Sequence, residues 1–157
     1  MLEKYFGNDR VDFGQINRSE RHPEWEVPYM SIPEQLKHKF IMCVRGNDVS
    51  TSLKWVMSSN SIAVMPRPTV ESWFMEGLLR PDCHYLEIKP DYSDLLEKVD
   101  WLLTNPDIAE DIIHNANEWT MRFRNREMES LIMNEVVRRY FEYTGQEMAI
   151  VFNNLNK

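Results

Sequence analysis

The segment from Lys39 to Lys54 constrains the fold most, because it combines a short apolar run, a glycine and a series of helix-capping residues. The run from Phe40 to Val44 is typical of a parallel strand that is covered on both faces. Gly46 permits a tight turn after this strand, and the helix-capping residues that follow are Asn47, Asp48, Ser50, Thr51 and Ser52. The first turn of a helix leaves backbone N–H groups that can bind an anion, and Lys54 adds a positive charge. The segment therefore predicts either a phosphate-binding turn or an ordinary capped helix, and the residues alone leave both interpretations open.

The next part of the chain repeats this alternation of apolar runs and helix signals. Ser61 to Met65 and His84 to Ile88 are the second and third strand candidates. We expect a helix from Ser50 to Asn60 between the first two strands and a short helix from Val70 to Met75 between the last two. The sequence Ser31-Ile-Pro-Glu resembles a capping box and predicts a short helix ahead of the first strand. Strands and helices that alternate at this spacing indicate an α/β fold with a parallel sheet and right-handed crossovers.

The remainder of the chain is predicted to be helical. Leu95 to Leu103 carries apolar residues at helical spacing, and Asn105-Pro106 provides a cap and a first-turn proline for the next helix. A last helix is expected from Arg126 to Tyr143, with Gly145 as its stop signal. The apolar residues of these last two helices that we expect to face inward are Ile108, Ile112, Ala116, Trp119 and Phe123, and Leu131, Ile132, Val136 and Tyr140.

Residues 1–30 differ from the rest, because they are aromatic and polar and are interrupted by glycines and prolines. Val11 to Ile16 is the only plausible strand among them. We therefore predict an N-terminal arm or interdomain segment over residues 1–30, and one domain with C-terminal helices over residues 31–157.

Composition and spacing exclude several classes of function. The 157 residues suit one domain with a buried core, and the net charge of −7 disfavours a nonspecific nucleic-acid surface. Two cysteines do not make a disulfide framework, so a reducing compartment is expected, and the absence of a signal peptide or a transmembrane run predicts a cytoplasmic protein. The clusters that come closest to a metal site lack the paired spacing of zinc ligands, so we predict no metal. Those clusters are Asp82-Cys83-His84 with Glu76, and Asp111 with His114 and Glu118.

Several short motifs in a fixed order carry a family resemblance. They are the stretch from Lys39 to Met65, then Glu71-Ser-Trp-Phe-Met-Glu-Gly-Leu-Leu, His84-Tyr85, and Asp91-Tyr-Ser-Asp-Leu-Leu-Glu. Together they resemble the C-terminal half of glycosyltransferase family 90. The resemblance is closest to the bacterial lipopolysaccharide-core transferases, extends to the eukaryotic protein O-glucosyltransferases, and spans about residues 31–125.

The resemblance implies a fold and a ligand. The fold is the C-terminal domain of a two-domain GT-B architecture, a Rossmann-like parallel sheet with flanking helices and a helical C-terminal region. The ligand is a nucleotide-sugar, usually a UDP-sugar, which the family binds without a metal or another cofactor. By position, the segment from Gly46 to Lys54 would face the donor diphosphate, and Glu71 or Ser72 would lie near the ribose.

One position departs from the family, because Ser52 stands where the eukaryotic members place an arginine on the diphosphate. Serine cannot replace a bidentate, permanently charged contact. Either Lys54, Arg45 or Arg67 supplies the charge, or the domain binds the donor weakly. The full set of expected donor-binding residues is Arg45, Gly46, Asn47, Asp48, Ser50, Thr51, Ser52, Lys54, Arg67, Glu71 and Ser72.

The family also places the acceptor site and the carboxylate that acts as general base in the N-terminal half, and residues 1–30 are too short to be that half. We therefore expect a donor-binding domain of a glycosyltransferase for lipopolysaccharide or surface-glycan biosynthesis, with no catalytic base and little activity alone. The alternative is a noncatalytic interaction module that retains the sheet and binds a partner subunit through its C-terminal helices.

The expected partners follow from these two hypotheses. They are a nucleotide-sugar and, through the missing half, a lipopolysaccharide-core or other glycan acceptor. The arginines of the last two helices indicate either a solvated helix face or a peripheral contact with the inner membrane or with an anionic lipid-linked acceptor. Exposed aromatic residues favour self-association, with Trp25, Tyr29 and Trp73 as candidates.

Overall fold

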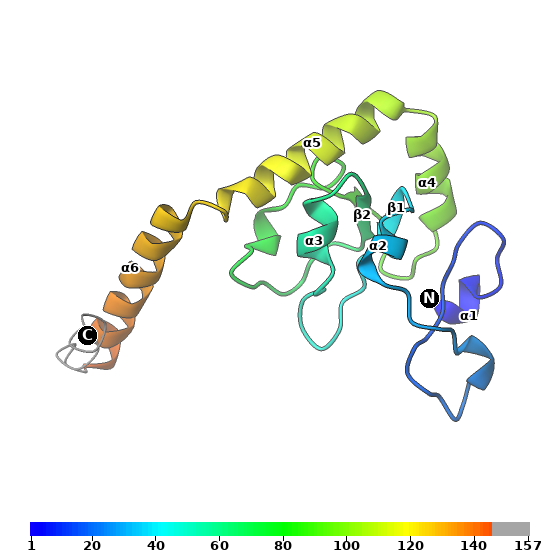
Figure 1. Ribbon diagram of the computed structural model, residues 1–157, viewed down its shortest axis with the longest axis horizontal. Helices are drawn as coiled ribbons and strands as arrows, with labels where there is room; N and C mark the ends of the chain where they lie inside the picture. The colour runs from blue at the N-terminus through cyan, green and yellow to red at the C-terminus, as the bar shows by residue number, and fades with distance from the viewer. Residues whose placement is uncertain (146–157) are drawn as a thin grey trace. The chain divides into compact units, whose positions relative to one another are not determined.

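The computed structural model of the chain describes residues 1–145 (Figure 1). The chain divides into two compact units, of which the first is Met1–Trp119 and the second begins at Thr120. The boundary falls near the end of helix α5 (Pro106–Arg122). The first unit contains a sheet with short helices around it, and the second contains the long helix α6 (Arg126–Thr144).

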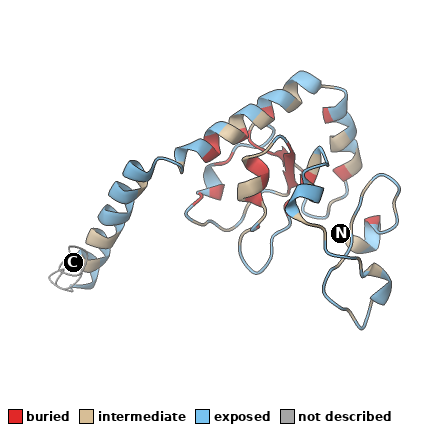
Figure 2. Cartoon of the chain, in the orientation of Figure 1, coloured by how far each residue is buried: buried red, intermediate tan, exposed pale blue. Residues whose placement is uncertain are grey.

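The first unit is built on three parallel strands, β1 (Phe40–Met42), β2 (Ile62–Met65) and β3 (Leu86–Glu87). Their order in the sheet is β1-β2-β3, in a register that sets Val64 opposite Leu86. The central strand β2 is buried along its whole length, as Figure 2 shows. All three predicted strands are confirmed, although each is shorter than the apolar run that predicts it.

A hydrophobic cluster surrounds the sheet and includes a residue of the predicted arm. Tyr5, at the end of α1 (Leu2–Tyr5), is buried in this cluster. Its hydroxyl donates to the backbone carbonyl of Tyr92, and its ring meets the edge of Phe13 with the ring centres 6.3 Å apart. The start of the chain is therefore anchored in the core of the first unit, while the division at residue 30 stays a prediction. The buried members of the cluster are Tyr5, Ile62, Val64, Leu86, Ile88, Leu95, Leu102 and Ile112.

The helices around the sheet begin largely where the sequence predicts. α4 (Leu95–Leu103) follows β3, and α5 starts at Pro106, because proline suits the first helical position. Burial of Ile112, Ala116 and Trp119 confirms most of the inner face predicted for α5. α3 (Leu53–Met57) connects β1 to β2 but is much shorter than the expected helix from Ser50 to Asn60.

The predicted capping box is confirmed at α2 (Ile32–Gln35), just before β1. The Glu34 carboxylate accepts hydrogen bonds from the Ser31 hydroxyl at 2.6 Å and from the Ser31 backbone N–H at 2.8 Å. These two bonds hold the pKa of Glu34 below its usual range. The chain therefore enters the first strand from a fixed direction.

The segment between β2 and β3 contains no α-helix from Val70 to Met75, so that prediction is wrong. Met75 adopts a left-handed backbone with φ 55°, which a helix interior excludes, and the short 3-10 turn η2 (Glu76–Leu78) follows it. The Ser72 N–H donates to the Glu76 carboxylate at 2.7 Å. A side-chain acceptor thus takes the place of the backbone carbonyl that a helix would provide.

The predicted strand from Val11 to Ile16 is also wrong. A single β-bridge joins Gln15 to Glu26, just after the 3-10 turn η1 (Pro23–Trp25). A Cβ atom added to Gly14 would lie 2.1 Å from a methyl carbon of Val27, so glycine allows these two stretches of the arm to approach closely. The arm is held by this local pairing and by Tyr5.

The helix α6 has the predicted limits but not the predicted burial. Asn125 caps its start by accepting the Met128 N–H, and Gly145 ends it with φ 66°. Leu131, Ile132, Val136 and Tyr140 were expected to face inward, and all four are exposed. The reason is that residues 120–145 provide no second layer within this unit against which the helix could pack. Among residues 1–145 no helix combines the length and the apolarity that crossing a bilayer requires.

Candidate functional site

Two loops meet at the carboxyl edge of the sheet. One follows β1 and carries Arg45, and the other follows β2 and carries Arg67 and Thr69. The Nη1 atom of Arg45 donates to the Thr69 hydroxyl at 2.8 Å, so the two loops are joined. Open α/β sheets bind ligands beyond the carboxyl ends of their strands. This edge is therefore the candidate site, and both arginines on it are exposed.

The loop after β1 does not require its glycine for folding. Gly46 does not adopt a positive φ, and a Cβ atom added to it would meet nothing within 4 Å. Asn47, Asp48 and Thr51 are exposed on the same loop. The space in front of Gly46 is therefore open to solvent or to a ligand.

The hydroxyls at the end of this loop point toward a buried thiol. Ser50 is buried, and its hydroxyl lies 3.0 Å from that of Ser52. Burial raises the pKa of the Cys43 thiol to about 12, and hydrogen bonds with Ser52 and Ser50 offset only part of this effect. Ser52 precedes α3 but makes no side-chain capping bond. The simple capping role that the sequence suggests for Ser52 is therefore absent.

Lys54 is held by a buried carboxylate on the other loop. Its Nζ atom lies 2.7 Å from the Oε1 atom of Glu76, which is only 2% exposed. Burial alone would raise the pKa of Glu76, but hydrogen bonds from Lys54 and Ser72 outweigh burial and lower it. The carboxylate is thus charged, and the Lys54 ammonium already has an anionic partner.

The two predicted ribose residues differ in how much of their side chain is available. Ser72 donates hydrogen bonds from its hydroxyl and its backbone N–H to the Glu76 carboxylate. Its side chain therefore serves the buried ion pair of Lys54 and Glu76. Glu71 is exposed, and its carboxylate lies against the backbone of Gly77, where an added Cβ atom would be 1.9 Å from Oε1. Glu71 therefore has the freer acceptor atoms of the two.

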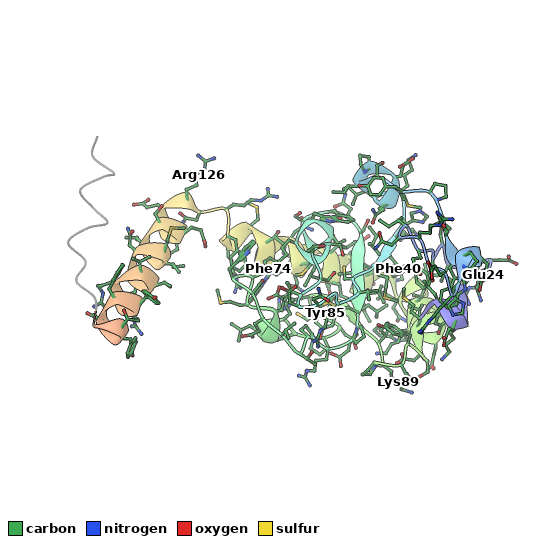
Figure 3. All side chains as sticks on the ribbon, turned by 90° about the horizontal axis from the view of Figure 1, so that it is seen from below. Glu24, Phe40, Phe74, Tyr85, Lys89 and Arg126 are labelled. Carbon is green, nitrogen blue, oxygen red and sulfur yellow. The ribbon has the colours of Figure 1, made fainter. Side chains whose placement is uncertain are left out.

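The two residues just before β3, His84 and Tyr85, are structural. Tyr85, labelled in Figure 3, is fully buried, and its hydroxyl donates to Glu87 at 2.7 Å. Burial and the nearby Glu87 carboxylate raise the pKa of Tyr85, while Arg67 acts in the opposite direction. The Nδ1 atom of His84 accepts the Arg80 backbone N–H at 2.9 Å. The His84-Tyr85 motif therefore fixes the loop that leads into β3.

The structure brings together some of the predicted site residues and adds one. Arg45 meets the loop after β2, and Lys54 is linked to Ser72 through Glu76. From sequence, Glu76 is named among the metal candidates, and its pairing with Lys54 is not predicted. The signal that could have identified it is its position four residues after Ser72, which permits a side-chain bond to the Ser72 N–H.

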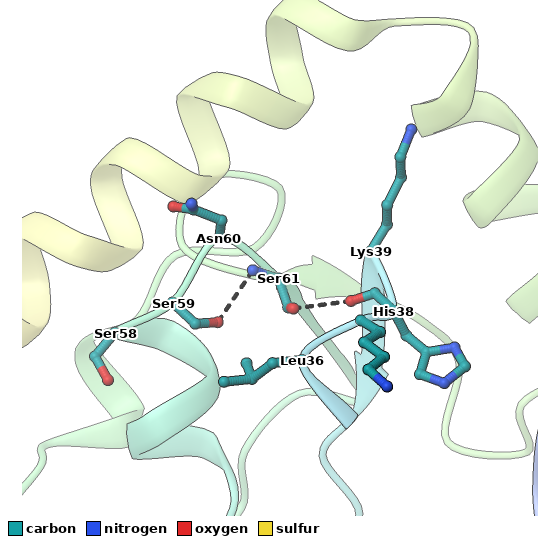
Figure 4. Close-up of a pocket in the computed structure, with 8 residues that line it drawn as sticks. Leu36, His38, Lys39, Ser58, Ser59, Asn60 and Ser61 are labelled. Atoms are coloured by element: carbon teal, nitrogen blue, oxygen red, sulfur yellow. Dashed lines mark hydrogen bonds between the residues drawn. The ribbon is translucent and has the colours of Figure 1, made fainter. Parts of the chain in front are cut away.

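A hollow of about 450 Å³ lies at the opposite edge of the sheet (Figure 4). Its hydroxyls serve the fold, since Ser61 donates to the His38 carbonyl at 2.8 Å and Ser59 accepts the Ser61 N–H at 3.0 Å. His38 and Ser61 lie just before the first residues of β1 and β2, at the amino ends of these strands. This hollow therefore lies away from the candidate site. The residues that line it are Leu36, Lys37, His38, Lys39, Ser58, Ser59, Asn60 and Ser61.

The residues that the sequence suggests as metal ligands do not come together as a metal site. Asp82 lies 3.3 Å from the ammonium of Lys98, and His114 forms an exposed pair with Glu118 at 3.6 Å. Within residues 1–145 no three His, Cys, Asp or Glu side chains gather as a metal site would require.

Comparison with known proteins gives the class to which the chain belongs. The family described as glycosyl transferase family 90 matches residues 11–147, so the chain belongs to this family, and the resemblance deduced from the motifs is confirmed. It is 36% identical over 140 residues to the O-glucosyltransferase LpsA of Dichelobacter nodosus, covering 89% of this chain and 44% of LpsA.

Two viral proteins of much greater length are also similar. Uncharacterized protein 179R of Invertebrate iridescent virus 6 is 29% identical over 119 residues, which cover 71% of this chain and 10% of that protein. Uncharacterized protein 027R of Frog virus 3 is 28% identical over 109 residues, which cover 66% of this chain and 11% of that protein. The chain thus spans less than half the length of each of these relatives.

Proposed function

We propose that this chain is the donor-binding part of a family 90 glycosyltransferase and that it binds a UDP-sugar at the carboxyl edge of its sheet, without a metal. The observation that carries the proposal is the contact of Arg45 with Thr69, which joins the loops after β1 and β2 where α/β sheets receive ligands. In this proposal the sheet and its helices act as the Rossmann-like C-terminal domain of a GT-B enzyme.

Arg45 and Arg67 supply the positive charge for the diphosphate. Lys54 is a poorer candidate, because its ammonium is 2.7 Å from the Glu76 carboxylate and would have to leave a buried anion unpaired. Arg45 uses one N–H group on Thr69, and a guanidinium has five, so donors remain for phosphate oxygens. The two arginines take the place of the arginine that eukaryotic members of the family have at the position of Ser52.

Glu71 accepts the ribose hydroxyls in the same proposal. Its carboxylate is exposed, and an ionised carboxylate offers two acceptor oxygens to a pair of neighbouring hydroxyls. Ser72 stabilises the loop and does not bind the ligand, because its hydroxyl donates to Glu76 Oε1 at 2.8 Å. Gly46 leaves room for a phosphate to approach the backbone of the first loop.

Calorimetric titration with UDP and with UDP-glucose tests the proposal. Arg45→Ala and Arg67→Ala should each weaken binding by about tenfold or more, because each removes hydrogen bonds to a charged group. Gly46→Val should leave the melting temperature close to that of the wild type, since an added Cβ atom meets nothing within 4 Å in the free protein, but should weaken binding by filling the ligand space. Arg18→Ala, in the exposed part of the arm, is the matched control and should bind as the wild type does.

Two results would refute this function. One is a folded wild-type chain that binds neither UDP nor UDP-glucose. The other is UDP affinity that is the same in the wild type and in all three site variants, which would place the nucleotide elsewhere.

The activity of the whole protein is a wider proposal. We infer that the sugar acceptor is a lipopolysaccharide-core or related surface glycan, as the resemblance to the bacterial lipopolysaccharide-core transferases implies, and that a longer polypeptide supplies the acceptor site and the general base. The acceptor brings the protein to the cytoplasmic face of the membrane as a peripheral protein.

A second candidate function is favoured by α6. Its apolar residues Leu131, Met133, Val136 and Tyr140 are each more than half exposed, at 59%, 67%, 61% and 57%, as expected for a helix that binds another polypeptide. An interaction module of this kind would have no affinity for UDP. Millimolar UDP should therefore raise the melting temperature of a donor-binding domain and leave that of a pure interaction module unchanged.

A further inference from the structure

The carboxylate of Glu76 is the most deeply enclosed charge of the candidate site. The residue is 2% exposed, and both of its oxygens are hydrogen-bonded. Oε1 accepts from Lys54 Nζ at 2.7 Å and from the Ser72 hydroxyl at 2.8 Å. Oε2 accepts the Ser72 backbone N–H at 2.7 Å and lies 3.1 Å from the Ser72 hydroxyl. One carboxylate thus connects helix α3 to the loop after β2.

Aromatic residues around Lys54 and Glu76 also hold the loop after β2. Phe74 lies between Ser72 and Glu76 in the sequence and is 1% exposed. Its backbone N–H donates to the Ser72 hydroxyl at 3.3 Å. The Lys54 ammonium lies 5.4 Å from the ring centre of Phe74 and 5.9 Å from that of Trp73. The indole N–H of Trp119, on α5, donates to the Phe74 carbonyl at 3.3 Å. The loop is therefore held by contacts with both α3 and α5.

We propose that Glu76 is a positioning residue, which holds the loop bearing Glu71 and Ser72 onto α3, and that Lys54 is its structural counter-ion and makes no contact with the diphosphate. The consequence for ligand binding rests on the donor-binding function proposed above. The positioning of the loop itself does not depend on it.

The physical reason is the cost of leaving a buried charge without its partner. Removing one member of a buried, hydrogen-bonded ion pair exposes the other to an uncompensated desolvation penalty, whereas removing both charges is often tolerated. The pKa of Glu76 lies below its usual range, so the residue is ionised at neutral pH and needs its cation. A lysine that left this carboxylate to bind phosphate would incur that penalty.

Hydrogen exchange tests the positioning role without any ligand. Glu76→Gln and Lys54→Met should each speed exchange in the peptide that contains Ser72 by about tenfold or more, the scale of one lost hydrogen bond to a charged group. Exchange in the peptide that contains β2 should stay slow, which shows that the variants fold. Asp82→Asn removes a surface pair with Lys98 and is the control, with no change expected in the Ser72 peptide.

UDP affinity tests the role of Lys54, because the two interpretations predict opposite signs. If Glu76 positions the loop, Glu76→Gln weakens UDP binding by about tenfold, as expected for a misplaced ligand-binding group. If Lys54 is a phosphate ligand that Glu76 restrains, Glu76→Gln frees the ammonium and tightens binding. The double variant Lys54→Met with Glu76→Gln should lose less loop protection than Lys54→Met alone, because it leaves no unpaired charge.

Unchanged exchange at Ser72 in folded Glu76→Gln would overturn the positioning role, whatever UDP does. Tighter UDP binding by the same variant would overturn the structural assignment of Lys54. A wild-type chain without UDP affinity would refute the proposed function alone, and the exchange data would still decide whether Glu76 holds the loop.

Discussion

Gly77→Ala separates ligand binding from stability at the candidate site. Gly77 lies in η2 and does not adopt a positive φ, so alanine is compatible with its backbone. The new Cβ atom would lie 1.9 Å from Glu71 Oε1 and 2.9 Å from Glu71 Cδ. The carboxylate must move, and because it ends an exposed, flexible side chain it can do so at little cost to the fold.

The size of the displacement sets the size of the effect. Ordinary contact begins near 3.4 Å, so the Glu71 oxygen must retreat from 1.9 Å by about 1.5 Å. Hydrogen-bond lengths vary over only about 0.5 Å, so a displaced carboxylate loses the ribose hydroxyls. Loss of hydrogen bonds to a charged group costs about 1.5–3 kcal/mol, or roughly 10- to 150-fold in affinity. Stability should change in the other direction, by about 0.4–1 kcal/mol in favour of the folded state, because alanine restricts the unfolded chain.

Calorimetry with UDP and thermal unfolding measure the two effects on the same protein. Gly77→Ala should weaken UDP binding while its melting temperature stays level or rises. In a chain that already carries Glu71→Ala, Gly77→Ala should have no further effect on affinity, because the group it displaces is gone. Unchanged affinity in folded Gly77→Ala, or an equal loss in the Glu71→Ala chain, would refute the assignment of Glu71 to the ribose.

Two further predictions concern the N-terminal arm and the buried thiol. Tyr5→Ala removes a residue that is 5% exposed and should lower the free energy of unfolding by about 3 kcal/mol or more. Phe6→Ala, at a residue that is 37% exposed, should lower it by less than about 1 kcal/mol. Equal urea midpoints for the two variants would contradict this prediction. A thiol reagent at pH 8 should label Cys83 in the native chain and Cys43 only after unfolding, since burial raises the pKa of Cys43 from 9.0 to about 12. Because the folded pKa is the higher one, the contribution of Cys43 to stability is complete below pH 9 and is lost as the pH rises toward 12, which urea unfolding across this range checks.

The sheet could be predicted from sequence because its signals are local. The run from Phe40 to Val44 indicates a buried strand by its short length, and Asn105-Pro106 combines a cap and a first-turn proline in adjacent residues. The failed helix from Val70 to Met75 shows the limit of local signals. There the Ser72 N–H donates to the carboxylate of Glu76 four residues later, and Glu76 is in turn held by Lys54, which is 22 residues away in the chain. This arrangement prevails over helix formation.

The sequence assigns the donor site to the segments after β1 and β2, and that assignment stays a prediction. The structure shows that these two segments meet, through the contact of Arg45 with Thr69. The pairing of Lys54 with Glu76 could not be read from the sequence, because the two residues are brought together only when the loop folds over α3. The same holds for Ser50 and Ser52, whose orientation toward Cys43 depends on the path of the loop between them.

The charge of the whole chain bears on which residues can hold an anionic donor. A net charge of −7 opposes a diphosphate at long range, but at physiological ionic strength such repulsion is screened beyond about 8 Å. Binding therefore depends on cations within direct contact distance. Of the three basic residues first considered, Lys54 is neutralised by Glu76, and the two exposed arginines are each next to a strand end. The acidic composition and the buried ion pair thus both favour Arg45 and Arg67 as the residues that hold the diphosphate in the function proposed above.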